Sequence, residues 1–545
     1  MSTNKLFLKL LLATIFVSSY SCSDDLEVAP NDVIVKENFF NSEADFRAAT
    51  APLYNRVWFS FNDKFYFGLG DGRSYNLYAP FSDYVYPFSD LTETGLTGPL
   101  VEAWRSFYIV IQQSNNTIEA IRGSSVAEEL KTQYIAEARF MRGTAYWYIA
   151  SLWGDAIITT SQAEIINNPI INKSPRNDVF EFAIRDLEYA AMYLPEQAGQ
   201  AGRVTKYSAY GMLSRVYLSY SGVSDNPNSG TRDAGLLNLA KMAAEKAITE
   251  GPYSLMDDYA DLFMVESNNN SESMFALQWV PNGEYGVTNP HQAYFALGSE
   301  ITGDDAAWGY YTRASYDVLQ EYEQNDVRRK ATWMADGDFY PEISQANGGY
   351  LVEHENTYVN VKKGVVGSNK DNPDISRMNS GLNTYMLRLG EVYLNYAEAV
   401  LGNNASTSDA TALMYVNALR ERAGLEPKTS LTFDDIFHER RVELAMEGQF
   451  WYDLVRRAYY EQQEVIQYID NQERAVITPF TYDAETNTVS VDDTRDVTTR
   501  AVGDADGSIF ILPYPESEVV QNPLLREEPV PYEFTEERLT DELFQ

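Results

Sequence analysis

The chain has 545 residues and a formal net charge of −37 at pH 7, from 79 acidic and 42 basic side chains. A charge of this size repels phosphate backbones, so we expect no nucleic-acid partner. Hydrophobic residues make up 44% of the chain, which excludes a disordered protein. One cysteine and three scattered histidines offer neither a disulfide nor a metal cluster, so we expect no metal site and no cofactor.

The first residues have the layout of an export signal. Lys5 and Lys9 precede the apolar run 10–17, which is shorter than the roughly 17–25 residues that a membrane span needs. Small residues and then Cys22 follow, as in bacterial lipoproteins. We therefore predict a signal peptide over residues 1–21, lipidation of Cys22 and an extended tether over residues 22–41. Tyr20 departs from the usual pattern, so an ordinary secretory signal with an incidental cysteine is the alternative.

Beyond the tether, helical periodicity alternates with long stretches that lack it. Apolar spacing predicts a helix over 42–58, whereas the Gly-, Pro- and aromatic-rich stretch 59–99 is predicted to be a long ordered loop. Helical spacing resumes over 100–250, and a second irregular stretch covers 253–384. The remaining predicted elements are helices over 385–401, 410–423 and 433–459, short strands over 274–280 and 358–362, and strand and turn from residue 477.

The clearest helix covers residues 135–155 and is apolar around most of its circumference. Such a helix must be covered by other helices rather than by water. Gly143 would let a neighbouring helix approach, and Trp147 and Trp153 would fill the gaps between helices. Gly154 then supplies the C-terminal stop. We predict that this helix anchors an α-helical scaffold.

The helical stretches 42–58, 100–250 and 385–460 are predicted to be two-helix hairpins that stack like degenerate tetratricopeptide repeats. The expected fold class is therefore mainly α: a tetratricopeptide-like helical-hairpin scaffold with long inserted loops and a few short strands. We expect residues 42–545 to form one domain, with the two irregular stretches as insertions that bind the ligand. An irregular helical bundle is the alternative on these patterns alone.

The two irregular stretches are rich in aromatic side chains, in a chain that holds 39 Tyr, 26 Phe and 8 Trp. Pyranose rings have apolar C–H faces and hydroxyl edges, so a glycan site needs exposed aromatic platforms beside planar hydrogen-bonding groups. For any single ring, packing inside the loop is the competing explanation. The candidate ligand-binding residues are Arg73, Tyr75, Asn76 and Tyr78 in the first stretch, and Trp279, Asp304, Trp308, Tyr310 and Tyr311 in the second.

Seven segments in chain order are AEARFMRGTAYWYIASLWGD (136–155), GRVTKYSAYGMLSRVYL (202–218), YEQNDVRRKATWM (322–334), MLRLGEVYLNYAEAV (386–400), VNALRERAGL (416–425), HERRVELAMEGQFWYDLVRR (438–457) and FILPYPESEVVQNPLL (510–525). Together they resemble the SusD/RagB family of outer-membrane nutrient-binding lipoproteins. The resemblance spans nearly the whole mature chain. Its one small departure is Gln449-Phe450, where an arginine often follows the glycine.

This resemblance implies a tetratricopeptide-like scaffold with a ligand-binding face built from inserted loops. We expect a non-enzymatic lipoprotein that captures an oligosaccharide and delivers it to a SusC-like TonB-dependent transporter. The acidic residues after Cys22 resemble the surface-export signal of Bacteroidota lipoproteins, so the chain would be anchored in the outer membrane and face outward. A peptide-binding RagB-type uptake lipoprotein is the alternative.

A surface endoglycosidase is a third hypothesis, because Glu439, Glu443 and Glu447 recur every four residues and glycoside hydrolysis uses paired carboxylates. Charge pairing where helices meet is the favoured explanation of the same residues. The acidic turn at 504–507 misplaces its glycine for a calcium loop, so a solvated turn explains it equally well. The expected partners of the three glutamates are Arg420, Arg422, Arg440 and Arg441.

Overall fold

The computed structural model describes residues 40, 42–303, 307–353, 358–472, 474, 480–491 and 506–545. The predicted signal peptide, the lipidation site Cys22 and most of the tether lie outside the described residues, as does the candidate Asp304. No helix within the described ranges is long and apolar enough to cross a lipid bilayer.

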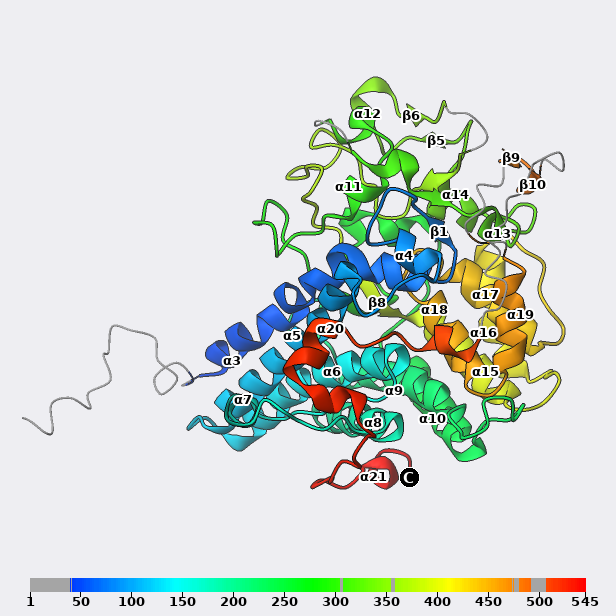
Figure 1. Cartoon of the computed structure of the whole chain (residues 1–545). Helices are drawn as coiled ribbons and strands as arrows, with labels where there is room; N and C mark the ends of the chain where they lie inside the picture. Colours follow the sequence, from blue (N-terminus) through cyan, green and yellow to red (C-terminus); the bar gives the residue numbers. More distant parts are fainter. Residues whose placement is uncertain are drawn as a thin grey trace, which may run out of the picture.

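Helices make up most of the molecule, and successive long helices pack on one another (Figure 1). This confirms the predicted fold class, a mainly α scaffold of helical hairpins with a few short strands. The long helices are α3 (Glu43–Thr50), α5 (Gly98–Arg122), α6 (Glu128–Leu152), α8 (Arg176–Tyr193), α9 (Lys206–Ser221), α10 (Ala234–Thr249), α15 (Leu389–Leu401), α16 (Ala410–Arg422), α17 (Phe433–Glu443), α18 (Phe450–Ala458) and α19 (Gln462–Asp470). Shorter ones are α4 (Tyr86–Ser89), α7 (Gln162–Asn167), α11 (His291–Phe295), α12 (Ser299–Thr302), α13 (Tyr316–Leu319), α14 (Arg328–Thr332), α20 (Glu516–Gln521) and α21 (Thr540–Leu543).

Helix α6 lies at the centre of the scaffold, as predicted. Its side chains are buried without interruption from Tyr134 to Leu152. A Cβ added at Gly143 would lie 2.9 Å from the carbonyl oxygen of Ala183, so α8 approaches α6 at the glycine. The indole of Trp147 donates a hydrogen bond of 3.0 Å to Ser219 on α9. This helix is apolar around its circumference because other helices, including α8 and α9, pack against it.

The predicted loop 59–99 is wrong in its first part. Residues 59–72 continue the chain as a helix that widens into π turns at η3 (Phe61–Phe65) and η4 (Gly68–Gly72). A Cβ at Gly70 would lie 2.3 Å from the Cα of Gly448, and one at Gly68 would lie 2.3 Å from the carbonyl oxygen of Tyr84. The glycines that suggested a loop are thus required by backbone packing inside the protein.

Two other helix predictions differ from the structure. The first turn of the predicted helix 385–401 is instead strand β8 (Thr384–Arg388), which pairs antiparallel with β2 (Ser273–Leu277). The predicted helix 433–459 is broken between α17 and α18, where Met446 and Gly448 have φ values of +63° and +66°. Apolar spacing continues across both positions, so periodicity did not reveal them.

The second insertion contributes most of a small mixed region above the scaffold (Figure 1). Its apolar core includes Phe67 and Leu77 from the first insertion, Phe295 and Trp333 from the second, and Met446 from the scaffold. The two insertions therefore share one core, which lies against the break between α17 and α18. A four-stranded sheet has the order β1 (Leu77–Tyr78), β3 (Arg313–Ala314), β7 (Asn360–Val361) and β4 (Trp333–Met334). There are also two hairpins, one formed by β5 (Phe339–Tyr340) and β6 (Tyr350–Leu351) and the other by β9 (Phe480–Asp483) and β10 (Thr488–Val491).

We predict that Gly143→Leu lowers the free energy of unfolding by at least about 2 kcal/mol, because the side chain would separate α6 from α8. Urea denaturation followed by circular dichroism measures this change. Gly98→Leu is the matched control, since a Cβ at Gly98 meets no atom within 4 Å. Equal stability of the two variants would contradict the close contact at Gly143.

Candidate functional site

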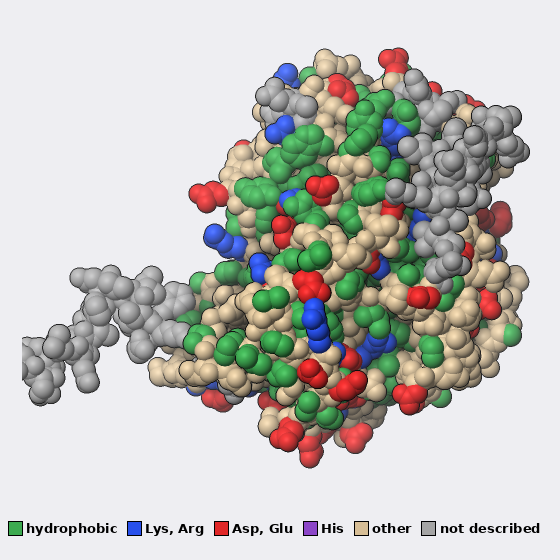
Figure 2. All heavy atoms as spheres, viewed as in Figure 1, with side chains coloured by type: hydrophobic (Ala, Val, Ile, Leu, Met, Phe, Trp, Pro, Cys, Tyr) green, Lys and Arg blue, Asp and Glu red, His purple; other side chains and the backbone are tan. Residues whose placement is uncertain are grey.

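An open groove of about 500 Å³ lies where the two insertions meet. We call it the aromatic groove and define it by the seven rings that line it. Hydrophobic side chains reach the surface over the insertions, in the upper part of the molecule, and also over the scaffold below (Figure 2). The seven rings are Phe67, Phe81 and Tyr84 from the first insertion and Tyr294, Trp308, Tyr310 and Tyr311 from the second.

Four of these rings face solvent. The exposed fractions are 77% for Phe81, 48% for Trp308, 37% for Tyr310 and 47% for Tyr311. The ring of Tyr311 lies 4.8 Å from that of Phe81 and 4.8 Å from that of Tyr310, edge to face in both pairs. Large exposed rings in mutual contact form an apolar surface of the kind that binds a partner or ligand. Trp308, Tyr310 and Tyr311 thus lie where the sequence hypothesis requires them to lie, at the surface.

Strand pairing brings the two insertions together. Leu77 and Tyr78 of β1 pair with Ala314 and Arg313 of β3, although more than two hundred residues separate the strands. Phe81 follows β1 by three residues, and Tyr311 precedes β3 by two. The contact between these two rings is therefore a direct consequence of the sheet register.

A buried asparagine holds the turn that presents the tyrosines. The side-chain amide of Asn360 donates to the carbonyl oxygens of Gly309, Tyr310 and Thr312 at 2.8, 3.0 and 3.2 Å. Gly309 crosses α11 so closely that a Cβ would lie 2.1 Å from the carbonyl oxygen of Phe295. The rings are thus mounted on a turn whose backbone is fixed before any ligand arrives.

The wall beside Trp308 is held by a shared carboxylate. Asp63 accepts hydrogen bonds from the hydroxyls of Tyr285 at 2.7 Å and Tyr294 at 2.9 Å. The ring of Tyr294 lies 5.6 Å from that of Trp308. Burial, together with the negative charge of Asp63, raises the pKa of both tyrosines above the ordinary value. Both phenols therefore remain protonated and keep donating to Asp63.

Four candidate residues are buried, and for them the sequence hypothesis of a ligand platform is wrong. Arg73 forms an ion pair with Glu93 at 2.6 Å, and its guanidinium lies 4.5 Å from the ring centre of Trp451. Asn76 accepts a hydrogen bond of 2.9 Å from Arg441. Tyr75 and Trp279 are also enclosed, with exposed fractions of 2% and 5%. These side chains meet protein on all sides and present no face to a sugar.

The remaining first-insertion candidate is half-buried. Tyr78 lies on β1 with its ring 6.3 Å from that of Tyr75, and it is not among the rings that line the aromatic groove. Sequence reasoning missed Phe67, Phe81, Tyr84 and Tyr294 as site residues. The available signal was the turn Pro80-Phe81-Ser82-Asp83, where polar and turn-forming residues surround a lone phenylalanine.

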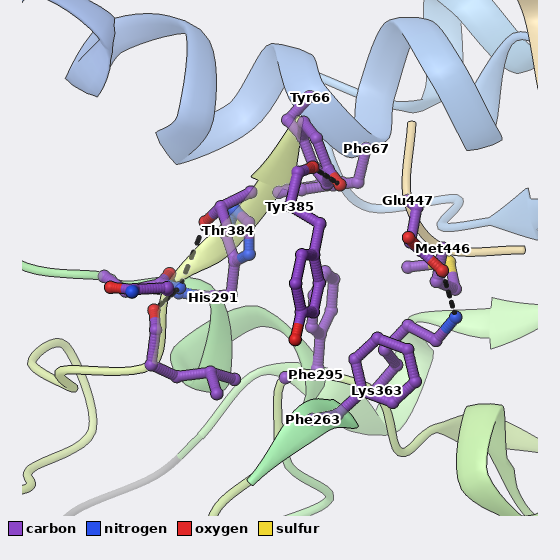
Figure 3. Close-up of a pocket in the computed structure, with 14 residues that line it drawn as sticks. Tyr66, Phe67, Phe263, His291, Phe295, Lys363, Thr384, Tyr385, Met446 and Glu447 are labelled. Atoms are coloured by element: carbon purple, nitrogen blue, oxygen red, sulfur yellow. Dashed lines mark hydrogen bonds and ion pairs between the residues drawn. The ribbon is translucent and has the colours of Figure 1, made fainter. Parts of the chain in front are cut away.

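A second, much smaller cavity of about 30 Å³ lies between the insertions and the scaffold (Figure 3). His291 contacts the carbonyl oxygen of Asn62 at 2.6 Å, and Lys363 pairs with Glu447 at 3.0 Å. Burial lowers the pKa of His291 to about 4 and that of Lys363 to about 8. The space is enough for about one or two water molecules and too small for a pyranose ring.

The three glutamates of the hydrolase hypothesis are enclosed in ion pairs. Glu443 contacts Arg388 at 2.7 Å and Arg328 at 2.9 Å, and Glu447 contacts Arg388 at 2.8 Å. Although burial alone would raise it, the pKa of Glu443 is lowered well below its ordinary range by the surrounding arginines. The predicted charge pairing is confirmed, with Arg420 and Arg422 among the partners. Arg440 and Arg441 instead pair with Asp453 and Asp317.

Comparison with known proteins shows which family has this sequence and fold. Residues 238–530 match the model of the SusD family, and residues 89–218 match a model described as starch-binding associating with outer membrane. A SusD-like protein of Bacteroides ovatus is 40% identical over 98% of this chain and 100% of its own length. The starch-binding protein SusD of Bacteroides thetaiotaomicron is 25% identical over 64% of this chain and 68% of its own length.

Solved structures agree with the sequence comparison. A crystal structure with a xylogluco-oligosaccharide superposes with a TM-score of 0.83 at 40% sequence identity, covering 90% of this chain and 100% of that chain. Another, of a SusD superfamily protein from Parabacteroides distasonis, has a TM-score of 0.67 at 20% identity over 89% of this chain and 98% of its own. The chain belongs to the SusD family.

We predict that Asn360→Ala loosens the tyrosine turn without unfolding the protein. Each hydrogen bond contributes about 1 kcal/mol, so losing three should speed amide hydrogen exchange across residues 308–312 by at least about tenfold. Mass-spectrometric hydrogen exchange measures this. Asn347→Ala, which removes one exposed local bond to Ser344, is the control and should leave these amides unchanged. Unaltered exchange in Asn360→Ala would show that the turn is held by other contacts.

Proposed function

We propose that this protein is a cell-surface lipoprotein that binds oligosaccharides in the aromatic groove and delivers them to a SusC-like TonB-dependent outer-membrane transporter. The observation that carries the proposal is the meeting of four exposed rings from two insertions, in a family where a relative has been crystallised with a xylogluco-oligosaccharide. The ring faces of Phe81, Trp308, Tyr310 and Tyr311 would cover the C–H faces of successive sugars. The hydroxyls of the two tyrosines and the carboxylate of Asp83 at the rim would bond sugar hydroxyls.

The expected affinity is modest. Each ring contact adds roughly 0.5–1.5 kcal/mol beyond its buried area, and each hydrogen bond adds about 1 kcal/mol net. A few such contacts correspond to a dissociation constant in the micromolar to millimolar range. Because the turn at residues 309–312 is already fixed by Asn360, little of this energy is spent on ordering the site. Weak binding suits a protein that must release its cargo to a transporter.

We further propose that the protein acts without catalysis. Glycoside hydrolysis requires two carboxyl groups on either side of the scissile bond. Among the described residues that line the aromatic groove, Asp83 is the one carboxylate. Glu439, Glu443 and Glu447 are instead held in ion pairs with buried arginines. Binding and handover are the functions that these groups support.

The membrane anchor belongs to the same proposal. A lipid on Cys22 would hold the chain at the outer membrane, in keeping with the family description that mentions association with that membrane. We predict that Cys22→Ser abolishes incorporation of a fatty-acid label and releases the protein from the membrane fraction. The wild-type chain labelled in parallel is the reference. Full labelling of Cys22→Ser would refute lipidation at this residue.

The ligand site is tested by Trp308→Ala. We predict at least tenfold weaker binding to an oligosaccharide that a glycan array identifies, with a melting temperature within about 1 °C of wild type, since the ring is 48% exposed. Isothermal titration calorimetry measures the affinity. Phe339→Ala removes an exposed ring outside the groove and should bind normally. Unchanged affinity in Trp308→Ala, or a wild-type protein that binds a peptide library and no glycan, would overturn the proposal.

A further inference from the structure

A separate pocket of about 300 Å³ lies between the helical scaffold and the C-terminal segment 532–536. Four arginines line it, namely Arg122 at the end of α5, Arg139 and Arg142 on α6, and Arg185 on α8. In a chain whose net charge is −37, such a concentration of guanidinium groups in one cavity is unexpected. We call it the arginine pocket, and it shares no residue with the aromatic groove.

The carboxylates of the arginine pocket do not balance its cations. Asp186 is shared, since it accepts bonds of 2.7 Å from both Arg139 and Arg142. Glu536 of the C-terminal segment contacts Arg139 at 2.6 Å and lies 3.9 Å from Arg122. These are the two acidic side chains that line the pocket among the described residues. Four guanidinium groups against two carboxylates leave a net charge of +2.

Arg185 carries the least satisfied guanidinium group of the arginine pocket. Its Nε and Nη1 atoms are buried and have no hydrogen-bond partner among the described residues. The nearest carboxylate, that of Glu181, is 3.9 Å away from Nη2, beyond hydrogen-bonding distance. The guanidinium instead lies 4.3 Å from the ring centre of Phe534. Buried donors without acceptors cost free energy. An anion that accepted hydrogen bonds from this guanidinium group would remove that cost, and its binding would therefore be favourable.

The inner part of the pocket is rigid, and its mouth is open. The side chains of Arg139 and Arg142 are each 6% exposed, and Arg142 also donates a bond of 2.6 Å to Asn115. At the mouth, the side chains of Arg122 and Glu536 are 58% and 51% exposed. A ligand would therefore enter past an exposed pair of opposite charge and meet a preformed wall of guanidinium groups.

We propose that the arginine pocket binds an oxyanion, a phosphate or a sulfate group. Guanidinium groups bind such groups well, because their planar forks donate two parallel hydrogen bonds to neighbouring oxygens. A tetrahedral oxyanion can accept from Arg122, Arg139 and Arg185 at once, whereas the single carboxylate of Glu536 now reaches Arg139 alone at hydrogen-bonding distance. The group can be a free ion or a substituent on a sugar or lipid headgroup, since these share the chemistry that the pocket recognises.

Inorganic phosphate and sulfate are the first probes, added to the full-length mature chain at constant ionic strength with chloride as the balancing ion. We expect saturable binding by calorimetry and a melting temperature that rises with phosphate, because a ligand that binds only the folded state stabilises it. Arg185→Gln should weaken phosphate binding at least tenfold. Glu536→Gln should strengthen it at least threefold, because it removes a competing carboxylate and adds one net positive charge.

Arg105→Gln is the matched control, since Arg105 pairs with Glu518 on the surface outside the pocket and its loss should leave phosphate binding unchanged. Circular dichroism establishes that each variant is folded, and the opposite directions expected for the two pocket variants separate recognition from a general loss of structure.

A sulfated monosaccharide and vesicles with or without phosphatidic acid then distinguish a sugar substituent from a lipid headgroup. Absence of phosphate and sulfate binding at about 20 mM, or equal affinity in wild type and Arg185→Gln, would overturn the proposal.

Discussion

The contact between Asp71 and the break after α17 is the constraint on which the aromatic groove depends. Buried Asp71 accepts hydrogen bonds of 2.8 Å from the backbone amides of both Met446 and Gly448, and Gly70 lies directly against Gly448. Burial raises the pKa of Asp71 to about 6 in spite of these donors. The carboxylate binds the backbone of the segment between α17 and α18, and it thereby holds the first insertion against the scaffold. From that attachment, the chain continues into β1, whose register with β3 brings the rings of the aromatic groove together.

The groove combines a rigid backbone with exposed side chains. Asn360 and Gly309 fix the turn that carries Tyr310 and Tyr311, and Asp63 fixes the wall beside Trp308. The polar groups that do this work are buried, while the rings they position face solvent. This arrangement explains how a long irregular insertion can present a defined apolar surface, because buried polar groups fix the backbone that carries the exposed rings.

Charge is distributed in two distinct ways. Between α15, α17 and the second insertion, buried arginines and glutamates are matched closely, as for Arg388 with Glu443 and Glu447, so the charges join helices and are unavailable for chemistry. In the arginine pocket the match fails, and Arg185 keeps buried donors without acceptors. The arginine pocket differs from that network in having four guanidinium groups against two carboxylates among its described lining residues.

The sequence by itself determined the helical scaffold, the central position of α6, the family and the two stretches that supply the rings of the aromatic groove. These features depend on local periodicity and on long shared segments, both of which can be recognised along the chain. Only the tertiary structure decided which rings are exposed. It also showed that Arg73, Tyr75, Asn76 and Trp279 are buried and that residues 59–72 are helical. Burial of Arg73 depends on Glu93 and Ile509, and burial of Trp279 depends on Thr384, so their surroundings come from residues far away in the chain. Composition and spacing carry no record of such contacts, because exposure is a property of what packs against a side chain and not of the side chain itself.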